Sequence, residues 1–375
     1  MTTMRGTVKS RKPRRARGAR GVTLVELLVA MVISLIAITA IFQVFSVFEG
    51  QKRTTMGGGE AQTNGALALF TLERDVRQAG YGINNFDFLG CTINAWDEKT
   101  STAFTLILVP VVITQGAGST PGVAGAPDTV TVMYGNSDLF PASVSLTQNM
   151  PSPSANYHVS NRYGFNEGDL IITAETGKDC TLAQVSNLPG TPGKSDNIVH
   201  NSGNYTDPVT GSQLSTRYNK PGGLEPSYTF NGKIFNLGSL PNNNTYSVSN
   251  AQLMLQQLLA ASSTAPVAIY DGIVQLQAQY GRDTNNDGII DVFDEFAPAT
   301  AGDWATIIAV RIGVVARSGL YEKTEVSPAT IKLWNDSATA PTTVGPVWTL
   351  TADERHYRYK VFHTVVPVRN MIWRP

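Results

Sequence analysis

The sequence predicts an α+β protein in which one long N-terminal helix precedes a β-rich domain. Three observations predict it: an uncharged apolar run at residues 27–48, apolar residues at helical spacing between 69 and 79, and short β-branched and aromatic segments from about residue 104. The chain has 375 residues, of which 42% are hydrophobic and 15% charged. This composition excludes a disordered chain and a coiled coil, so a sizeable core must be buried.

The first twenty residues form a basic tract with eight Lys or Arg residues and no acidic residue. The rest of the chain then has 21 basic against 29 acidic residues, a formal charge of −8. Because the apolar run follows at once, we interpret the tract as a topogenic signal and not as a nucleic-acid-binding arm. The acidic remainder argues against nucleic acid as a partner.

Residues 27–48 are predicted to span a membrane. The 22 residues carry no charge, and as a helix they extend about 33 Å, enough for the hydrocarbon core. The positive-inside bias keeps the N-terminus in the cytoplasm and sends the rest of the chain outward. A cleavable secretory signal is the alternative, but its apolar region is shorter, about 7–15 residues.

Glu26 lies at the edge of this run. A carboxylate at the centre of a membrane helix costs about 2.5–3.5 kcal/mol on insertion scales and therefore calls for a partner. The alternative is that Glu26 occupies the first helical turn, where the macrodipole contributes about 0.3–1 kcal/mol.

Residues 17–34, RGARGVTLVELLVAMVIS, resemble the type III signal of type IV pilins. The resemblance implies that a prepilin peptidase cuts after Gly21, that Val22 becomes the N-methylated first residue, and that Glu26 is the acidic fifth position. Val22 stands where the family usually has Phe. The carboxylate of Glu26 would then pair in the bilayer with the new α-amine of a neighbouring subunit. A plain signal anchor is the alternative, which leaves Glu26 unexplained.

A second helical segment follows the membrane run. Three glycines at 57–59 predict a break or flexible joint, because each costs about 1 kcal/mol relative to Ala. Beyond them an amphipathic helix is expected, with an i,i+4 pair of Glu73 and Arg77 and a stop at Gly80. Its apolar stripe is expected to be covered by a sheet and consists of Leu69, Leu72, Val76 and Ala79.

From about residue 104 the pattern becomes that of strands. Seven segments are expected to be extended, and Asn231-Gly232 predicts a two-residue hairpin. The segments are residues 103–114, 128–134, 169–175, 228–237, 267–280, 304–318 and 357–370. A helix is predicted at residues 251–261, AQLMLQQLLAA. Surface loops rich in Gly, Pro and Ser are predicted at 116–127, 150–156 and 188–194.

Four blocks, at residues 60–82, 269–288, 303–319 and 360–370, are similar in order to those of the PilW family of type IV pilus assembly proteins. The resemblance implies a type IV pilin-like fold and a minor pilin of the initiation or tip complex. Its partners would be other minor and major pilins, a PilY-type tip adhesin, the prepilin peptidase and the inner-membrane assembly platform. Such a protein is a single-pass inner-membrane protein that later reaches the periplasm and cell surface in the pilus, contributing to adhesion or twitching motility.

The expected domains are a cleaved leader at 1–21, a membrane and assembly helix at 22–48, an amphipathic half at 49–82 and an exported β-rich domain at 83–375. Residues 100–260 within that domain match no block and form an elaboration. Two alternative functions stay open: a type II secretion pseudopilin, and a calcium-regulated adhesive module on a pilin stalk.

The sequence offers little for catalysis, and no enzyme activity is predicted. There is no G-x-S-x-G, no H-E-x-x-H and no phosphate loop. His356 and His363 are seven residues apart in a strand-like segment, which places them on opposite faces of a sheet.

Two cysteines in an exported domain predict a disulfide between Cys91 and Cys180. The alternative is two free buried thiols.

The segment 283–294, DTNNDGIIDVFD, has the spacing of an EF-hand calcium loop, although its flanks are strand-like. Asp replaces the usual Glu at position 12, and neighbouring Glu295 is a substitute for it. The alternative is an acidic, solvated turn between strands. The predicted ligands of a structural calcium ion are Asp283, Asn285, Asp287, the Ile289 carbonyl, Asp291 and Asp294.

Overall fold

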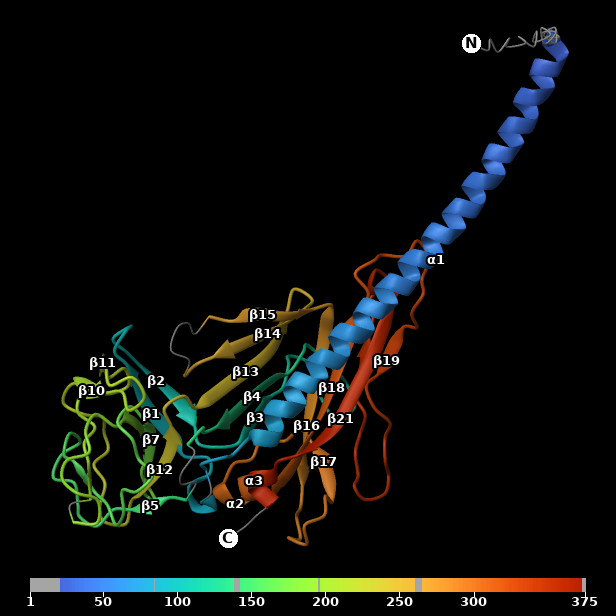
Figure 1. Cartoon of the computed structure of the whole chain (residues 1–375). Coiled ribbons are helices and arrows are strands. Elements are labelled where there is room, and N and C mark those ends of the chain that lie inside the picture. Colours follow the sequence, from blue (N-terminus) through green and yellow to red (C-terminus); the bar gives the residue numbers. More distant parts are fainter. Residues whose placement is uncertain (1–20, 84, 138–141, 195, 260–264, 373–375) are drawn as a thin grey trace, which may run out of the picture. The chain divides into compact units, whose positions relative to one another are not determined.

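The computed structural model describes residues 21–83, 85–137, 142–194, 196–259 and 265–372, and it confirms the α+β class. A long helix, α1 (Leu24–Gln78), is followed by several mainly antiparallel sheets (Figure 1). The chain forms two compact units, residues 1–55 and residues 56–375. The basic leader, apart from Gly21, lies outside the described residues.

Helix α1 continues through the glycines at 57–59, so the predicted break is wrong. Gly57 is buried, and a Cβ placed there would lie 3.4 Å from the Cβ of Ser318. Gly58 and Gly59 have no atom within 4 Å of such a Cβ. The intrinsic cost of three glycines is therefore outweighed by helix on both sides and by the close approach at Gly57.

The second half of α1 buries one stripe, as predicted. Leu72, Val76 and Ala79 are fully buried, and Leu69 is partly buried against the same core. The stripe continues toward the N-terminus through small residues, Ala68, Gly65 and Ala61. The predicted Glu73–Arg77 ion pair forms, and Gly80, at φ +79°, follows the end of the helix.

Three larger sheets make up most of the second unit. The first has the order β2-β1-β8-β7-β12-β5 and consists of β1 (Thr92–Asp97), β2 (Thr102–Ile107), β5 (Val144–Ser145), β7 (Leu170–Ala174), β8 (Cys180–Gln184) and β12 (Lys233–Gly238). The second, β15-β14-β13-β4-β3, consists of β3 (Val111–Thr114), β4 (Thr129–Tyr134), β13 (Asn242–Ser249), β14 (Gln252–Gln257) and β15 (Val267–Asp271). The third, β17-β16-β18-β21, consists of β16 (Ile273–Arg282), β17 (Val292–Asp294), β18 (Ile307–Arg317) and β21 (Tyr359–Pro367).

Short elements complete the unit. Three two-stranded sheets pair β6 (Tyr157–His158) with β9 (Asn197–Ile198), β10 (Asn204–Thr206) with β11 (Gln213–Ser215), and β19 (Thr330–Lys332) with β20 (Val347–Thr349). The short helices are η1 (Phe86–Phe88), α2 (Ala301–Ala305), η2 (Glu354–His356) and α3 (Arg369–Ile372).

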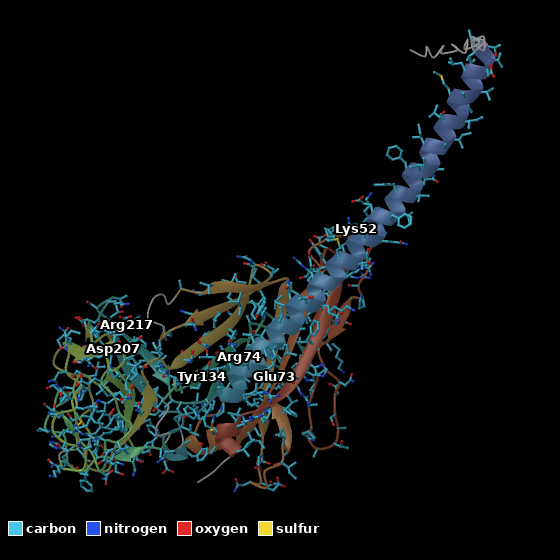
Figure 2. All side chains as sticks on the ribbon, in the orientation of Figure 1. Lys52, Glu73, Arg74, Tyr134, Asp207 and Arg217 are labelled. Atoms are coloured by element: carbon cyan, nitrogen blue, oxygen red, sulfur yellow. A yellow bond between two sulfur atoms is a disulfide. The ribbon has the colours of Figure 1, made fainter. Side chains whose placement is uncertain are left out.

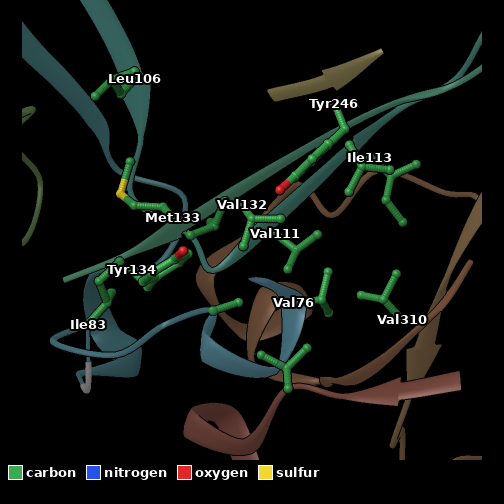
Figure 3. Packing of buried hydrophobic residues seen from close by; sticks show 14 of the residues in the cluster. Val76, Ile83, Leu106, Val111, Ile113, Val132, Met133, Tyr134, Tyr246 and Val310 are labelled. Atoms are coloured by element: carbon green, nitrogen blue, oxygen red, sulfur yellow. The ribbon is translucent and has the colours of Figure 1, made fainter. Parts of the chain in front are cut away.

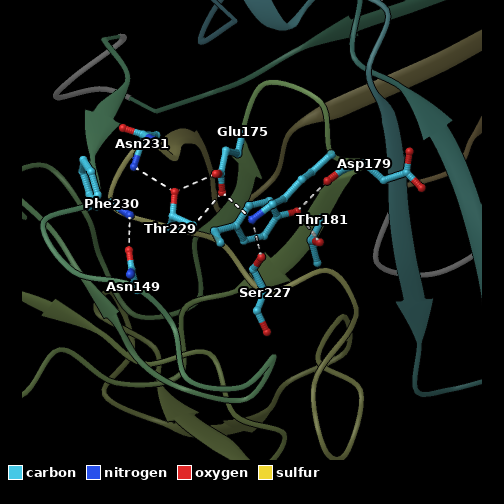
Figure 4. Close-up of polar contacts among 10 residues, drawn as sticks. Asn149, Glu175, Asp179, Thr181, Ser227, Thr229, Phe230 and Asn231 are labelled. Carbon is cyan, nitrogen blue, oxygen red and sulfur yellow. Dashed lines mark hydrogen bonds and ion pairs between the residues drawn. The ribbon is translucent and has the colours of Figure 1, made fainter.

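Two sequence predictions in this region are wrong. Of the predicted helix at 251–261, the described residues 251–259 do not form a helix: β14 occupies Gln252–Gln257 and is hydrogen-bonded between β13 and β15. The segment before Asn231-Gly232 is not a strand, so the predicted hairpin does not form. The strand after it, β12, pairs with β5 and β7. Side chains hold that segment, as Figure 4 shows: Thr229 donates its amide and hydroxyl to Glu175 at 2.7 and 2.6 Å.

The main core lies between the buried stripe of α1 and the sheets (Figure 3). The middle of the chain adds a second apolar cluster around Ile171, Tyr157 and Tyr228. Successive residues of β7 face different cores, since Ile172 belongs to the main core and Ile171 to the second. The elaboration at 100–260 is thus part of the second unit, with a small core of its own.

Candidate functional site

The first half of α1 presents an apolar surface with no cover. Every residue from 21 to 52 is exposed, including Leu24 at 78% and Phe42 at 72%. The helix is long and apolar enough to cross a membrane. The three hydroxyls within residues 27–48 all donate to backbone carbonyls one turn earlier, which satisfies them without water: Ser34 to Ala30, Thr39 to Leu35 and Ile36, and Ser46 to Gln43.

The start of this helix is a reciprocal cap. The Glu26 amide donates to the Thr23 hydroxyl at 3.3 Å, and the Glu26 carboxylate accepts from the Thr23 amide at 3.5 Å. Gly21 and Val22 precede the helix and are exposed. The capping geometry is that of the first-turn alternative for Glu26, and it leaves the carboxylate at the surface of the chain.

The predicted disulfide forms between Cys91 and Cys180, with the two Cα atoms 5.9 Å apart. Cys91 directly precedes β1 and Cys180 begins β8, and these two strands pair in parallel. The bond therefore fixes the register of this pair next to Ile93, which lies opposite Cys180.

Asp283 anchors the acidic loop between β16 and β17. It is only 3% exposed, and its two carboxylate oxygens accept from the amides of Asp287, at 3.1 Å, and Gly288, at 2.8 Å. The Asn285 side chain also accepts from the Asp287 amide, at 3.0 Å. Gly288 has φ +84°, a conformation that side chains rarely adopt.

Asp291 closes the loop from its other end. Its carboxylate accepts from the amide and hydroxyl of Thr284 at 2.8 and 2.7 Å, and the hydroxyl bond lowers the pKa of Asp291. The side-chain Nδ2 of Asn285 donates to the carboxylates of Asp287, at 3.1 Å, and Asp291, at 3.5 Å. The side chains of Asp287 and Asp291 thus both contact Asn285, whereas Asp283 is bonded to the backbone of the same loop. The carbonyl of Ile289 was also a predicted ligand, and the backbone amide of this residue donates to the Asp287 carboxylate at 2.8 Å.

Asp294 does not join them. Both of its oxygens accept from the Arg282 guanidinium, at 3.0 and 2.9 Å. The substitute, Glu295, accepts from Gln279 at 3.0 Å. As they stand, the described residues contain no group of three or more His, Cys, Asp or Glu side chains arranged to hold a metal ion.

Comparison with known families adds two matches. The model of the family described as Type IV Pilus-assembly protein W matches residues 240–370, and that of the prokaryotic N-terminal methylation motif matches residues 16–42. Together they support a PilW-type type IV pilus-assembly protein. No curated protein and no solved structure matches the chain. The PilW match contains the blocks at 269–288, 303–319 and 360–370, whereas the block at 60–82 lies outside both matches.

The methylation motif and the exposed apolar helix fit a pilin anchored in the inner membrane. The PilW family is a pilus-assembly family of structural proteins and not a family of enzymes. Of the two histidines expected on one strand, only His363 lies in β21; His356 lies in η2, stacked on Tyr321 with ring centroids 4.6 Å apart, so that prediction is wrong.

Sequence reasoning missed Asp75, on the buried side of α1. It is 1% exposed and accepts from Asn244 at 2.7 Å and from the Tyr246 hydroxyl at 2.6 Å, which ties α1 to β13 (Tyr246 is labelled in Figure 3). Burial, and next the charge of Asp75, raise the pKa of Tyr246. The only signal in the sequence was an acid adjacent to the apolar position Val76.

Proposed function

We propose that this PilW-type chain is a minor pilin of the initiation or tip complex that primes type IV pilus assembly. The observation that carries the proposal is the uncovered apolar half of α1, with Glu26 five residues after Gly21 and with a PilW match at the other end of the chain. About thirty exposed, mostly apolar residues need lipid or neighbouring helices around them. The partners proposed are minor and major pilins, a PilY-type adhesin, the prepilin peptidase and the assembly platform.

In the proposed sequence of events, the peptidase cuts after Gly21 and the basic leader stays behind. Val22 then carries a new α-amine, and Glu26 of one subunit pairs with that amine on its neighbour. An ion pair in a low-dielectric surrounding is much stronger than one in water, so pairing selects the correct neighbour and register. Within an isolated chain one carboxylate oxygen of Glu26 accepts from the Thr23 amide, and the other oxygen would pair with the amine.

Processing is tested by N-terminal sequencing and intact mass of protein extracted from membranes. The expected N-terminus is Val22, with the mass of one added methyl group. A chain that keeps Met1, or one that begins near Ala40, would show that the pilin interpretation is wrong.

The role of Glu26 is tested with Glu26→Gln, using Glu49→Gln as the matched control, because Glu49 is exposed on the same helix. The Glu26 variant should insert and be cleaved normally but lose co-purification with other minor pilins, and pili should be fewer. The control should retain both. Normal pilus number in the Glu26 variant would leave only the capping role.

A secretion pseudopilin and an adhesive module on a pilin stalk remain the alternatives. Loss of secretion with intact pili would favour the first. Deleting residues 115–225 would remove β4, β7 and β8 and so break two sheets. A cleaner test replaces the exposed hairpin at 204–215 with a short Gly-Ser turn. Pili that form but no longer attach would favour adhesion through this hairpin.

We also propose that the loop at 283–291 binds a structural calcium ion. The support is the EF-hand spacing of Asp283, Asn285, Asp287 and Asp291, together with the contacts of the Asn285 side chain to Asp287 and Asp291. Binding would require these side chains to exchange some backbone partners for the ion. Asp294 is left out of this ligand set because Arg282 holds it.

Calcium is tested by unfolding the full chain in detergent with added calcium or with EGTA. Calcium at about 100 times its dissociation constant should add about 2.7 kcal/mol to the free energy of unfolding. Asp287→Asn should abolish the difference, whereas Asp207→Asn, a change at a partly exposed residue in the β10–β11 turn, should keep it. Equal unfolding with calcium and with EGTA would contradict the proposal.

A further inference from the structure

A cavity of about 490 Å³ lies where α1 ends in the second unit. Its wall combines segments far apart in the chain: the last turn of α1, the loop after it, the end of β4, the start of β13, and α3. Figure 2 labels Glu73 and Tyr134 in this region. The lining residues are Arg77, Gln78, Tyr81, Tyr134, Gly135, Asn136, Ser137, Asn242, Arg369 and Asn370.

Hydrogen bonds hold this wall in place. The Asn370 side chain donates to the carbonyls of Gln78 and Ala79, at 3.2 and 2.9 Å, which fixes α3 against the end of α1. The Tyr81 hydroxyl donates to the Ser137 carbonyl at 2.8 Å, and the Tyr81 carbonyl accepts from Gly135 at 2.7 Å. Asn370 thus satisfies the carbonyl of Gln78, the last residue of α1, and that of Ala79 directly after it.

The cavity has a positive character. Two of the ten lining residues are arginines and none is acidic. Arg77 also forms an ion pair with Glu73, which lies one turn earlier on α1. Arg369 is exposed and has no hydrogen bond or ion pair within the described part of the chain. Burial, and next the charge of Asp75, raise the pKa of Tyr134 to about 12, so its hydroxyl stays protonated at neutral pH.

We propose that this cavity binds an acidic peptide segment of a partner protein, with Arg369 and Arg77 pairing its carboxylates. The guanidinium fork matches a carboxylate with two parallel hydrogen bonds. Two carboxamide side chains, of Gln78 and Asn242, offer both donors and acceptors to a peptide backbone. Phosphate needs only donors, so the mixed lining favours a peptide. The volume lies within the range of about 300–1,000 Å³ typical of ligand sites.

The test uses the full chain in detergent and a fluorescein-labelled peptide, Gly-Ser-Asp-Glu-Gly-Ser, measured by anisotropy. The comparison peptide is Gly-Ser-Asn-Gln-Gly-Ser, and inorganic phosphate is a competitor. The protein variants are Arg369→Gln and Asn242→Asp, the second of which adds a carboxylate to the wall. The control is Arg358→Gln, since Arg358 pairs with Glu322 away from the cavity. Unfolding curves confirm that all variants are folded.

The acidic peptide should bind at least tenfold more tightly than its amide counterpart. Arg369→Gln and Asn242→Asp should each weaken it by about tenfold or more, with Arg358→Gln unchanged. Equal affinity for the two peptides, no binding of either, or equal loss in the control would overturn the proposal. Phosphate that competes as well as unlabelled acidic peptide at the same concentration would overturn the peptide assignment and indicate a general anion site.

Discussion

Gly65 shows how closely α1 approaches its sheet. A Cβ built at this position would lie 2.2 Å from the Phe362 ring and 3.0 Å from the Cβ of Ala316. The ring must move for any larger residue to fit. Gly58, about two turns earlier on the same face of the helix, has no atom within 4 Å of such a Cβ. A side chain at Gly65 would therefore clash with the sheet, whereas a side chain at Gly58 would have free space.

We expect Gly65→Ala to lower the free energy of unfolding by about 1–3 kcal/mol through overpacking. Gly58→Ala should raise it by about 0.5–1 kcal/mol, because Ala loses less backbone entropy in a helix. Denaturant unfolding of the full chain in detergent measures both. Two changes of the same sign would contradict this packing.

Burial of His200 should make the stability of the protein depend on pH. It is buried, stacks on Tyr157 with ring centroids 4.2 Å apart, and hydrogen-bonds the Ala155 carbonyl at 2.9 Å. Burial lowers the pKa of His200 to about 4, from 6.5 in the unfolded chain. Between these values the unfolded state binds more protons, so the stability due to neutral His200 is present above pH 6.5 and lost as pH falls toward 4. The full loss is on the order of 3 kcal/mol.

Asp128 opposes this trend. Burial raises its pKa to about 6, so between about pH 4 and 6 its carboxyl makes the native state lose stability as pH rises. We expect His200→Gln, which keeps a donor toward Ala155, to remove only the histidine contribution. The difference in unfolding free energy between wild type and variant should then shrink from pH 7 to pH 4. A constant difference would mean that His200 does not titrate in this range.

At the scale of elements, the predictions from the sequence were correct where the spacing of apolar residues alone decides between helix and strand. A strand forms within each of the seven predicted segments, although residues 228–230 are not part of one, and the predicted stripe at Leu72, Val76 and Ala79 is buried. The helix prediction for residues 251–261 was wrong because Leu, Met, Gln and Ala favour a helix locally. Pairing with β13 and β15 on either side makes residues 252–257 a strand. At Asn231-Gly232 the turn was recognised, but not the bonds of Glu175 to Thr229.

The candidate sites divide in the same way. Gly21, Val22 and Glu26 form one short motif, and the loop at 283–291 is also local, so both were visible in the sequence. Asp294 failed to join the loop because its partner, Arg282, lies across the β16–β17 pair. The cavity was invisible, since Arg77 and Arg369 meet only after the whole chain has folded.

The disulfide carries an element-scale prediction. It closes a loop of 89 residues, for which the chain-entropy model gives at most about 4.6 kcal/mol. Replacing Cys91 and Cys180 together by Ala should lower the free energy of unfolding by about 2–5 kcal/mol. Unreduced, denatured wild-type protein should show no free thiol on labelling, and two labels per chain would contradict the bond.

The two units of the whole molecule differ in what they bury. None of the described side chains before Thr54 is buried, whereas residues 61–79 contribute to the main core. A chain beginning at Met56 should therefore fold with a melting temperature within about 2 °C of the full chain. A chain beginning at Gly80 should not fold, because it loses the buried stripe and leaves Asn244 and Tyr246 without Asp75. Circular dichroism and thermal melting of the two truncations check this.

The position of α1 also sets an order of events during synthesis. The helix is made first, yet its cover comes last: Phe362 packs on Gly65, and Asn370 bonds to Gln78 across 292 residues. At about 5–20 residues per second, the ribosome needs roughly 15–60 s to make that stretch. Throughout this interval residues 61–79 lack the contacts of β21, although β13, which bonds to Asp75, is made earlier. The neighbouring segment is apolar enough to have entered a bilayer already. The packing around α1 is therefore complete only after β21 and α3 have been made, close to the end of synthesis.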